Sequence, residues 1–334
     1  MVERDLFLPV AAQPSLEWLV EWGVDAERLG YDFVWMPETW GRDAVTILAT
    51  MATETDDIGL GTSILNVYSR SPALLGQTAA TLQEATDGRF RLGVGPSGPI
   101  LVEGWHGVEY GNPLRRTREA IEIIRAVLTG EELTYDGELF DLAGFRLRQG
   151  PPETPPPVDA AGLRSKSVEL AGRFGDGWHA LMANPEGLRE RMADFRRGAE
   201  LGGRDPDEQR VTVSLTCCAL DDRERARELV AGHLVFYVGA MGTFYREALA
   251  EQGFEEEAYE IAQHVGSGDN EAAMEAVTDE LLDSFSIAGT PEECRNRLET
   301  FERIDGVDAV SISFPRAAER DEIERTIDTL APQA

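Results

Sequence analysis

The chain has 334 residues, of which 42% are hydrophobic and 28% are charged, as is typical of globular proteins. It carries 31 basic and 61 acidic residues, which give a formal net charge of −30, and Lys166 is its only lysine. So large a negative charge disfavours binding to nucleic acids and to anionic membrane surfaces.

The acidity itself has two explanations. An acidic surface suits a cationic partner, whereas excess carboxylates with few lysines suit a cytoplasm with molar salt, where they keep proteins hydrated and soluble. The acidic residues are spread from Glu3 to Asp328 without a block or tail, which favours the second explanation. We therefore expect a halophilic protein, whose self-repulsion is screened by a Debye length of about 3 Å in molar salt.

Short apolar segments alternate with longer amphipathic ones along the chain. The first part is expected to form a strand over 6–10, a helix from the N-cap Ser15 to Gly30, a strand over 33–36, a helix over 43–51, a strand over 58–65, a helix over 72–85 and a strand over 89–94. A helix over 113–128 follows. The alternation around Asp136-Gly137 then indicates a β-hairpin outside the main sheet.

The same rhythm continues after the proline cluster at 151–157. We expect a strand over 158–161, a helix over 165–174, a strand over 177–180, a helix over 185–198, a strand over 211–219, a helical segment over 223–282 broken near Gly239 and Gly253, a helix over 291–301 and a strand over 309–314. Eight evenly spaced apolar strands with helices between them favour a TIM barrel, the (β/α)8 member of the α/β class, over a doubly wound open sheet. A single domain over residues 1–334 is expected, with the hairpin and the helices near 225–285 as insertions.

Several classes of site are disfavoured by the pattern of cysteines and histidines. Cys217, Cys218 and Cys294 have no CxxC spacing and are expected to pack in the interior. No clustered Cys/His pattern, GxSxG motif or P-loop occurs, so we expect no metal site and none of those catalytic motifs. The N-terminus has no signal pattern and no apolar run reaches 18 residues, which predicts a soluble cytoplasmic protein.

In a TIM barrel the functional residues follow the C-terminal ends of the strands. After the strand at 158–161, Gly162 leads into a helix start flanked by Arg164 and Lys166, which suits a bound phosphate or an ordinary turn about equally. After the strand at 33–36, Glu38 is a candidate general acid or base. It could equally be a salt-bridged loop acid or a neighbour of a helix cap.

Two further segments at the predicted mouth give weaker signals. The segment VGPSGP, from Val94, offers a small exposed backbone for a flat ring, or is simply a tight turn. The segment VEGWHG supplies Glu103 and His106. Lone histidines such as His106 and His179 are more often structural than catalytic.

Four segments carry a family resemblance that covers most of the chain: GYDFVWMPE, IGLGTSILNVYSRSPALLGQTAATLQEATDGRFRLGVGPSGPILVEGWHG, PLRRTREAIEIIRAVLTGE and AGRFGDGW. They are similar to the bacterial-luciferase-like superfamily, and most of all to its deazaflavin (coenzyme F420)-dependent oxidoreductases related to 5,10-methylenetetrahydromethanopterin reductase. The resemblance implies a TIM barrel with the deazaflavin ring at its mouth. It also implies a non-prolyl cis peptide bond at Ser63-Ile64 behind that ring.

The resemblance also implies which residues hold the coenzyme. Ring contacts are expected from Ser63, Ile64, Asn66, Gly95, Pro96 and Ser97, and phosphate contacts from Ala161, Gly162, Leu163 and Arg164. FMN is the alternative cofactor, as in a luciferase-like monooxygenase. A small-molecule substrate and a homodimer or homotetramer are expected as partners.

One departure from the family concerns the end of the second strand. Dehydrogenases of the family often have a His followed by a Trp there, whereas this chain has Thr39 followed by Trp40. A base for alcohol oxidation is therefore missing, which favours a reductase that transfers hydride from the reduced deazaflavin. Glu38 is the first candidate proton donor and Glu103 the second. Thr39 also leaves open a paralogue that binds the coenzyme without catalysis.

Overall fold

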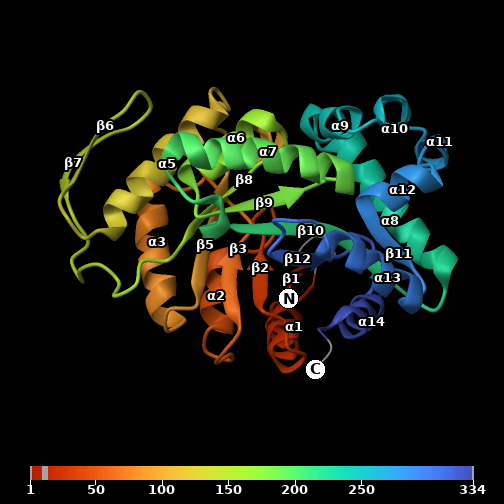
Figure 1. The fold of residues 1–334 in the computed structure, drawn as a ribbon, viewed down its shortest axis with the longest axis horizontal. Coiled ribbons are helices and arrows are strands. Elements are labelled where there is room, and N and C mark those ends of the chain that lie inside the picture. Colours follow the sequence, from red (N-terminus) through yellow and green to blue (C-terminus); the bar gives the residue numbers. More distant parts are fainter. Residues whose placement is uncertain (1, 10–13, 333–334) are drawn as a thin grey trace. The chain divides into compact units, whose positions relative to one another are not determined.

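The structure is a computed structural model that describes residues 2–9 and 14–332. Its chain divides into two compact units, and each combines parallel strands with covering helices (Figure 1). The first unit contains Met1–Asp32, Ala180–Ala193 and Val211–Ala334. The second unit contains Phe33–His179 and Asp194–Arg210.

The second unit is built on a parallel run of strands. In spatial order these are β2 (Phe33–Met36), β3 (Gly59–Thr62), β5 (Phe90–Gly95), β8 (Val158–Ala161) and β9 (Gly177–Leu181), and the short strand β4 (Leu65–Asn66) pairs with the end of β5. The helices are α2 (Ala44–Met51), α3 (Pro72–Ala85), α4 (Pro99–Gly104), α5 (Pro113–Leu128), α6 (Ser165–Phe174) and the part of α7 (Pro185–Gly202) from Asp194 onward, and a 3-10 turn follows at Pro206–Glu208. The predicted hairpin is present as β6 (Leu133–Asp136) and β7 (Asp141–Phe145), apart from the parallel strands (Figure 1).

Local sequence explains where these helices begin and how closely they pack. Ser71 caps α3 by accepting from Leu74 N, and Pro72 occupies the first turn, where its missing N–H has no cost. The α6–α7 contact requires glycine on both helices, because a Cβ at Gly172 would lie 2.1 Å from the carbonyl oxygen of Phe195. A Cβ at Gly198 would lie 2.1 Å from the carbonyl oxygen of Glu169.

The first unit contains the remaining parallel strands. Their order is β11 (Ser286–Gly289), β10 (Arg210–Ala219), β12 (Ala309–Ser313) and β1 (Glu3–Phe7). The helices are α1 (Leu16–Arg28), α8 (Arg223–Ala240), α9 (Thr243–Ala250), α10 (Glu255–Ser267), α11 (Asn270–Glu275), α12 (Asp279–Phe285), α13 (Pro291–Glu302) and α14 (Arg320–Leu330). Ser15 caps α1 by accepting from Trp18 N, as predicted.

The fold is an α/β TIM barrel of eight parallel strands, to which β11 adds at β10 and β4 at β5, with a small antiparallel hairpin and helical insertions, which confirms the predicted class. Cys217, Cys218 and Cys294 are buried and unbridged, in agreement with a packing role. No helix in the described residues is long and apolar enough to cross a membrane.

The helical insertion breaks near both predicted points and at further ones. Five helices, α8–α12, form it, and the break expected near Gly239 lies at Gly242, which has a φ of 95°. Gly239 itself is the next-to-last residue of α8, and a Cβ there would be 2.5 Å from the side chain of Val265 on α10. The predicted break at Gly253 is confirmed, with a φ of 96°.

Several strand bounds also differ from prediction. β1 begins at Glu3, not at residue 6, because a charged residue in this part of the strand is paired: Arg4 forms an ion pair with Glu302 at 2.6 Å. The end predicted at Val10 lies outside the described residues. The strand predicted over 58–65 is divided into β3 and β4. β11 was not predicted, since a four-residue apolar run between helices is a weak signal, and its pairing with β10 identifies it.

Candidate functional site

The predicted site residues all lie in the second unit, where they follow neighbouring parallel strands. Parallel strands present their C-terminal ends at the same edge of a sheet, so the segments after β2, β3, β5 and β8 meet there. Ser63 N donates to the carbonyl oxygen of Met36 at 3.0 Å, and Val67 N donates to that of Gly95 at 3.0 Å. A single edge therefore carries all four segments.

The segment between β3 and β4 contains a cis peptide bond at Ser63-Ile64, as the family resemblance implied. The Ile64 side chain faces Gly95 on β5, where an added Cβ would lie 3.4 Å from it and 3.2 Å from the Cβ of Ala161. A side chain at this point would be tightly packed. Pro96 and Ser97 follow directly, and Ser97 has a φ of 56°.

Asn66 is buried and fixes the turn that leaves β4. Its side-chain oxygen accepts from Tyr68 N at 3.0 Å and from Ser69 N at 2.7 Å. Its amide nitrogen lies 3.2 Å from Nε2 of His106, which is therefore part of this hydrogen-bonded turn. The interpretation of His106 as a structural histidine fits this geometry.

Glu38 lies in a polar cluster directly after β2. Its carboxylate makes two contacts with the guanidinium of Arg70, one of them at 2.9 Å, and accepts from Ala44 N at the start of α2 at 3.3 Å. Arg70 also donates to Asp43 at 2.5 Å. This is the geometry of a salt-bridged acid beside a helix start, one of the roles that the sequence left open for Glu38.

The other candidate catalytic residues are more exposed. Thr39 is half-buried, Trp40 is 49% exposed, and Glu103 is exposed on α4. Glu103 Oε1 accepts from Tyr110 N at 3.2 Å. Thr39 and Trp40 lie near the end of β2 because they follow it directly in the chain. Glu103 is bound to the loop after α4 by its hydrogen bond with Tyr110.

Two tyrosines at this edge were missed by the sequence reasoning. Tyr68 and Tyr110 stack with ring centroids 5.4 Å apart, and the Tyr110 hydroxyl donates to the carbonyl oxygen of Ser97 at 2.9 Å. Burial raises the pKa of both phenols, so they remain hydrogen-bond donors. Arg116 lies over the Tyr68 ring at 4.6 Å. Nothing in the spacing of these residues along the chain indicated that they would meet.

The start of α6 has the features expected of an anion site. A Cβ at Gly162 would lie 2.8 Å from the backbone nitrogen of Val168, so the strand end approaches the first turn of the helix closely. Ser167 Oγ accepts from the backbone N–H groups of Leu163 and Arg164, at 3.2 and 3.1 Å. Lys166 is exposed in this turn and makes no ion pair within the described residues.

A buried polar chain behind this edge was also missed. It connects Arg91 on β5, Asp159 on β8, His179 on β9 and Ser63 after β3. Burial alone would raise the pKa of the Asp159 carboxyl, but the Arg91 guanidinium, with the nearby His179, holds it well below its usual range. The members lie up to 116 residues apart, and only strand order and register bring them together.

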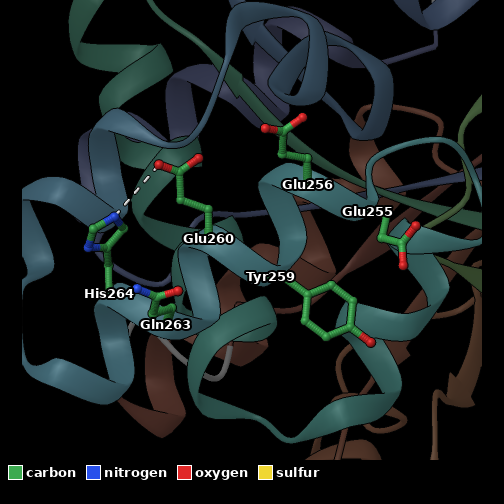
Figure 2. Close-up of a pocket in the computed structure, with 6 residues that line it drawn as sticks. All are labelled: Glu255, Glu256, Tyr259, Glu260, Gln263 and His264. Atoms are coloured by element: carbon green, nitrogen blue, oxygen red, sulfur yellow. Dashed lines mark ion pairs between the residues drawn. The ribbon is translucent and has the colours of Figure 1, made fainter.

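The first unit contains a different kind of surface feature, an open groove of about 540 Å³ along α10. Figure 2 shows its lining, Glu255, Glu256, Tyr259, Glu260, Gln263 and His264, with the ion pair between Glu260 and His264 at 3.7 Å. The glutamates repel anions, so this groove does not suit a phosphate-bearing ligand. It contains none of the predicted site residues.

Known proteins resemble this chain over most of its length. A family model described as luciferase-like monooxygenase matches residues 6–308. The 5,10-methylenetetrahydromethanopterin reductase of Methanolobus tindarius is 32% identical over 276 residues, which cover 82% of this chain and 83% of that protein. The enzyme of the same name from Archaeoglobus fulgidus is 31% identical over 313 residues, 92% of each chain.

Solved structures show the same fold. The coenzyme F420-dependent tetrahydromethanopterin reductase of Methanopyrus kandleri matches with a TM-score of 0.86 at 22% identity. The match covers 100% of this chain and 98% of that one.

Proposed function

The chain belongs to the luciferase-like monooxygenase family, and from this membership we propose that it is a coenzyme F420-dependent oxidoreductase acting as a reductase. Relatives at 31–32% identity that are named as reductases support this direction. The observation that carries the proposal is the shared edge of the second unit, where the segments expected to contact ring and phosphate come together.

The residues at this edge fit such a coenzyme. Gly95 presents backbone without a side chain beside Ile64 and Ala161, which suits a flat ring lying against it, and Asn66 and the backbone of Pro96 and Ser97 follow at the same strand ends. The helix start at Ala161–Arg164 suits the phosphate, since the positive end of the α6 dipole and the exposed Lys166 both favour an anion. When bound, the reduced deazaflavin supplies a hydride. The protein orients the acceptor beside the ring and excludes water.

The acceptor is proposed to be a small molecule with a carbon–nitrogen, carbon–carbon or carbonyl double bond. Thr39 leaves no imidazole at the end of β2, which supports reduction over alcohol oxidation. Oxidation of reduced deazaflavin, followed by absorbance with a panel that includes methylenetetrahydromethanopterin, tests this function. Turnover with one acceptor is expected. Coenzyme binding with no turnover on any acceptor would favour a non-catalytic paralogue.

Glu38 and Glu103 remain the proposed proton donors, Glu38 first. The substitution Glu38→Gln removes the carboxyl group but keeps the size of the side chain, so it tests proton transfer with little change in packing. This substitution is expected to reduce turnover about 10²-fold, the typical contribution of a general acid or base, with coenzyme affinity nearly unchanged. The matched control is Asp43→Asn, which removes the other carboxylate that Arg70 contacts. Equal losses in both variants would mean that only the Arg70 pairing matters, and unchanged turnover in Glu38→Gln would remove Glu38 from the mechanism.

We also propose that the protein works in molar salt, in which the net charge of −30 is screened. Raising potassium chloride from 0.1 M to 2 M is expected to raise the thermal unfolding midpoint by about 5 °C or more, because self-repulsion weakens. Differential scanning calorimetry measures this shift. A midpoint that stays constant or falls would argue against adaptation to salt.

The assembly in solution is proposed to be a homodimer or homotetramer, as the family resemblance implies. FMN remains the alternative cofactor, since the family model that matches this chain is described as luciferase-like monooxygenase.

A further inference from the structure

His179 is a buried histidine that the proposed chemistry does not use. It lies on β9 with 5% of its surface exposed, and its Nδ1 is 3.2 Å from the hydroxyl oxygen of Ser63. Its Nε2 is 3.4 Å from Oδ2 of Asp159, which is 1% exposed. The Nε2 contact with Asp159 is electrostatic, since its geometry is not that of a hydrogen bond, whereas Nδ1 lies at hydrogen-bond distance from Ser63.

The charges around the imidazole decide which nitrogen carries its proton. Asp159 receives two hydrogen bonds from Arg91, at 2.9 and 2.6 Å, and is ionised, so it can only accept. In a neutral imidazole, this negative charge 3.4 Å away favours the proton on Nε2, which faces Asp159. Nδ1 is left with a lone pair, and the Ser63 hydroxyl must be the donor in the contact between them.

Packing holds the ring in this orientation. The indole of Trp35 meets the imidazole edge to face, with centroids 4.5 Å apart. Gly93 has no side chain on the other side, where an added Cβ would lie 3.1 Å from Nε2 of His179 and 2.0 Å from the carbonyl oxygen of Thr62. The carbonyl oxygen of His179 also accepts from Gly162 N at 3.4 Å, which connects the same residue to the proposed phosphate segment.

We propose that His179 is a positioning residue that holds the Ser63 hydroxyl as a donor toward the interior, so that Ser63 presents only an acceptor to a donor group of the coenzyme ring. This inference rests on the proposed function, which puts Ser63 at the ring. Loss of the Nδ1 acceptor would free the hydroxyl to turn and offer its proton outward, where it would meet another donor.

Two near-isosteric variants test the assignment. The amide oxygen of His179→Asn can replace Nδ1 as the acceptor for Ser63, whereas the amide of His179→Gln replaces Nε2 as the donor to Asp159 and leaves Ser63 without its acceptor. The readouts are the dissociation constant of F420, measured by its fluorescence, and the absorption maximum of the bound ring. His179→Asn is expected to remain within about threefold of wild type, and His179→Gln to bind about tenfold more weakly with a shifted maximum.

A double-mutant cycle separates this role from a merely structural one. If His179 acts through Ser63, then Ser63→Ala with His179→Gln should bind no more weakly than Ser63→Ala alone. The control is His233→Asn. This second buried histidine lies on α8, accepts from Arg316 N at 3.1 Å, and has its pKa lowered to about 4 by burial and by Arg316. His233→Asn should bind F420 as wild type does.

The outcomes are distinct. Equal affinities of His179→Asn and His179→Gln, or additive losses in the cycle, would overturn the role of His179 while leaving the proposed function intact. Wild-type protein that binds no F420 would overturn both.

Discussion

Asp159→Leu is expected to lower the free energy of unfolding by about 3–5 kcal/mol, the usual cost of leaving one partner of a buried ion pair behind. The Asp159 side chain is 2% exposed and that of Arg91 is 16% exposed, so the guanidinium would keep its charge with little water to solvate it. The same substitution removes the acceptor that faces Nε2 of His179. Reversible urea unfolding at fixed high salt measures the loss.

The double variant Arg91→Met with Asp159→Leu is the matched control. It removes both charges and fills the space with apolar atoms, so it should be more stable than Asp159→Leu alone. A single variant that loses less than about 1 kcal/mol, or a double variant that is no better, would mean that the pair is solvated and not part of a dry interior.

Lys166→Glu is expected to weaken coenzyme binding at least about tenfold. Lys166 is an exposed cation in the first turn of α6, where the positive end of the helix dipole also lies, and the substitution puts a carboxylate beside the proposed phosphate. The loss should be larger in 0.2 M than in 2 M salt, since salt screens exposed charges. Fluorescence titration with F420 measures it.

Arg173→Glu makes the same change of charge at the other end of the same helix, where Arg173 lies over the Phe174 ring at 5.2 Å. It should leave the affinity within about twofold of wild type, because its charge is remote from the first turn. Equal losses in the two variants would show that overall charge controls binding and that the start of α6 does not hold the phosphate.

The sequence was sufficient to predict features that depend on local pattern. The alternation of apolar strands and helices predicted the eight strands of the barrel, and Ser15 marked the start of α1 as its N-cap. The family resemblance implied the cis bond at Ser63-Ile64. These features are decided by neighbouring residues or by a long ordered match.

Features that depend on contacts between distant residues could not be predicted. The pairing of Glu38 with Arg70 joins residues 32 apart, and the contact of Ser63 with His179 joins residues 116 apart. His179 looked like one more isolated histidine, because its partners are visible only once strand register is known. The close packing at Gly239 could likewise not be predicted, since the Val265 side chain that lies against it is further along the chain.

The central claim is that the second unit binds a deazaflavin, and the most direct test is equilibrium binding of purified protein to F420 and to FMN in 2 M salt. We expect saturable quenching of F420 fluorescence with a dissociation constant at least about tenfold below that for FMN. Tight FMN binding with none for F420 would contradict the claim and favour a flavin monooxygenase.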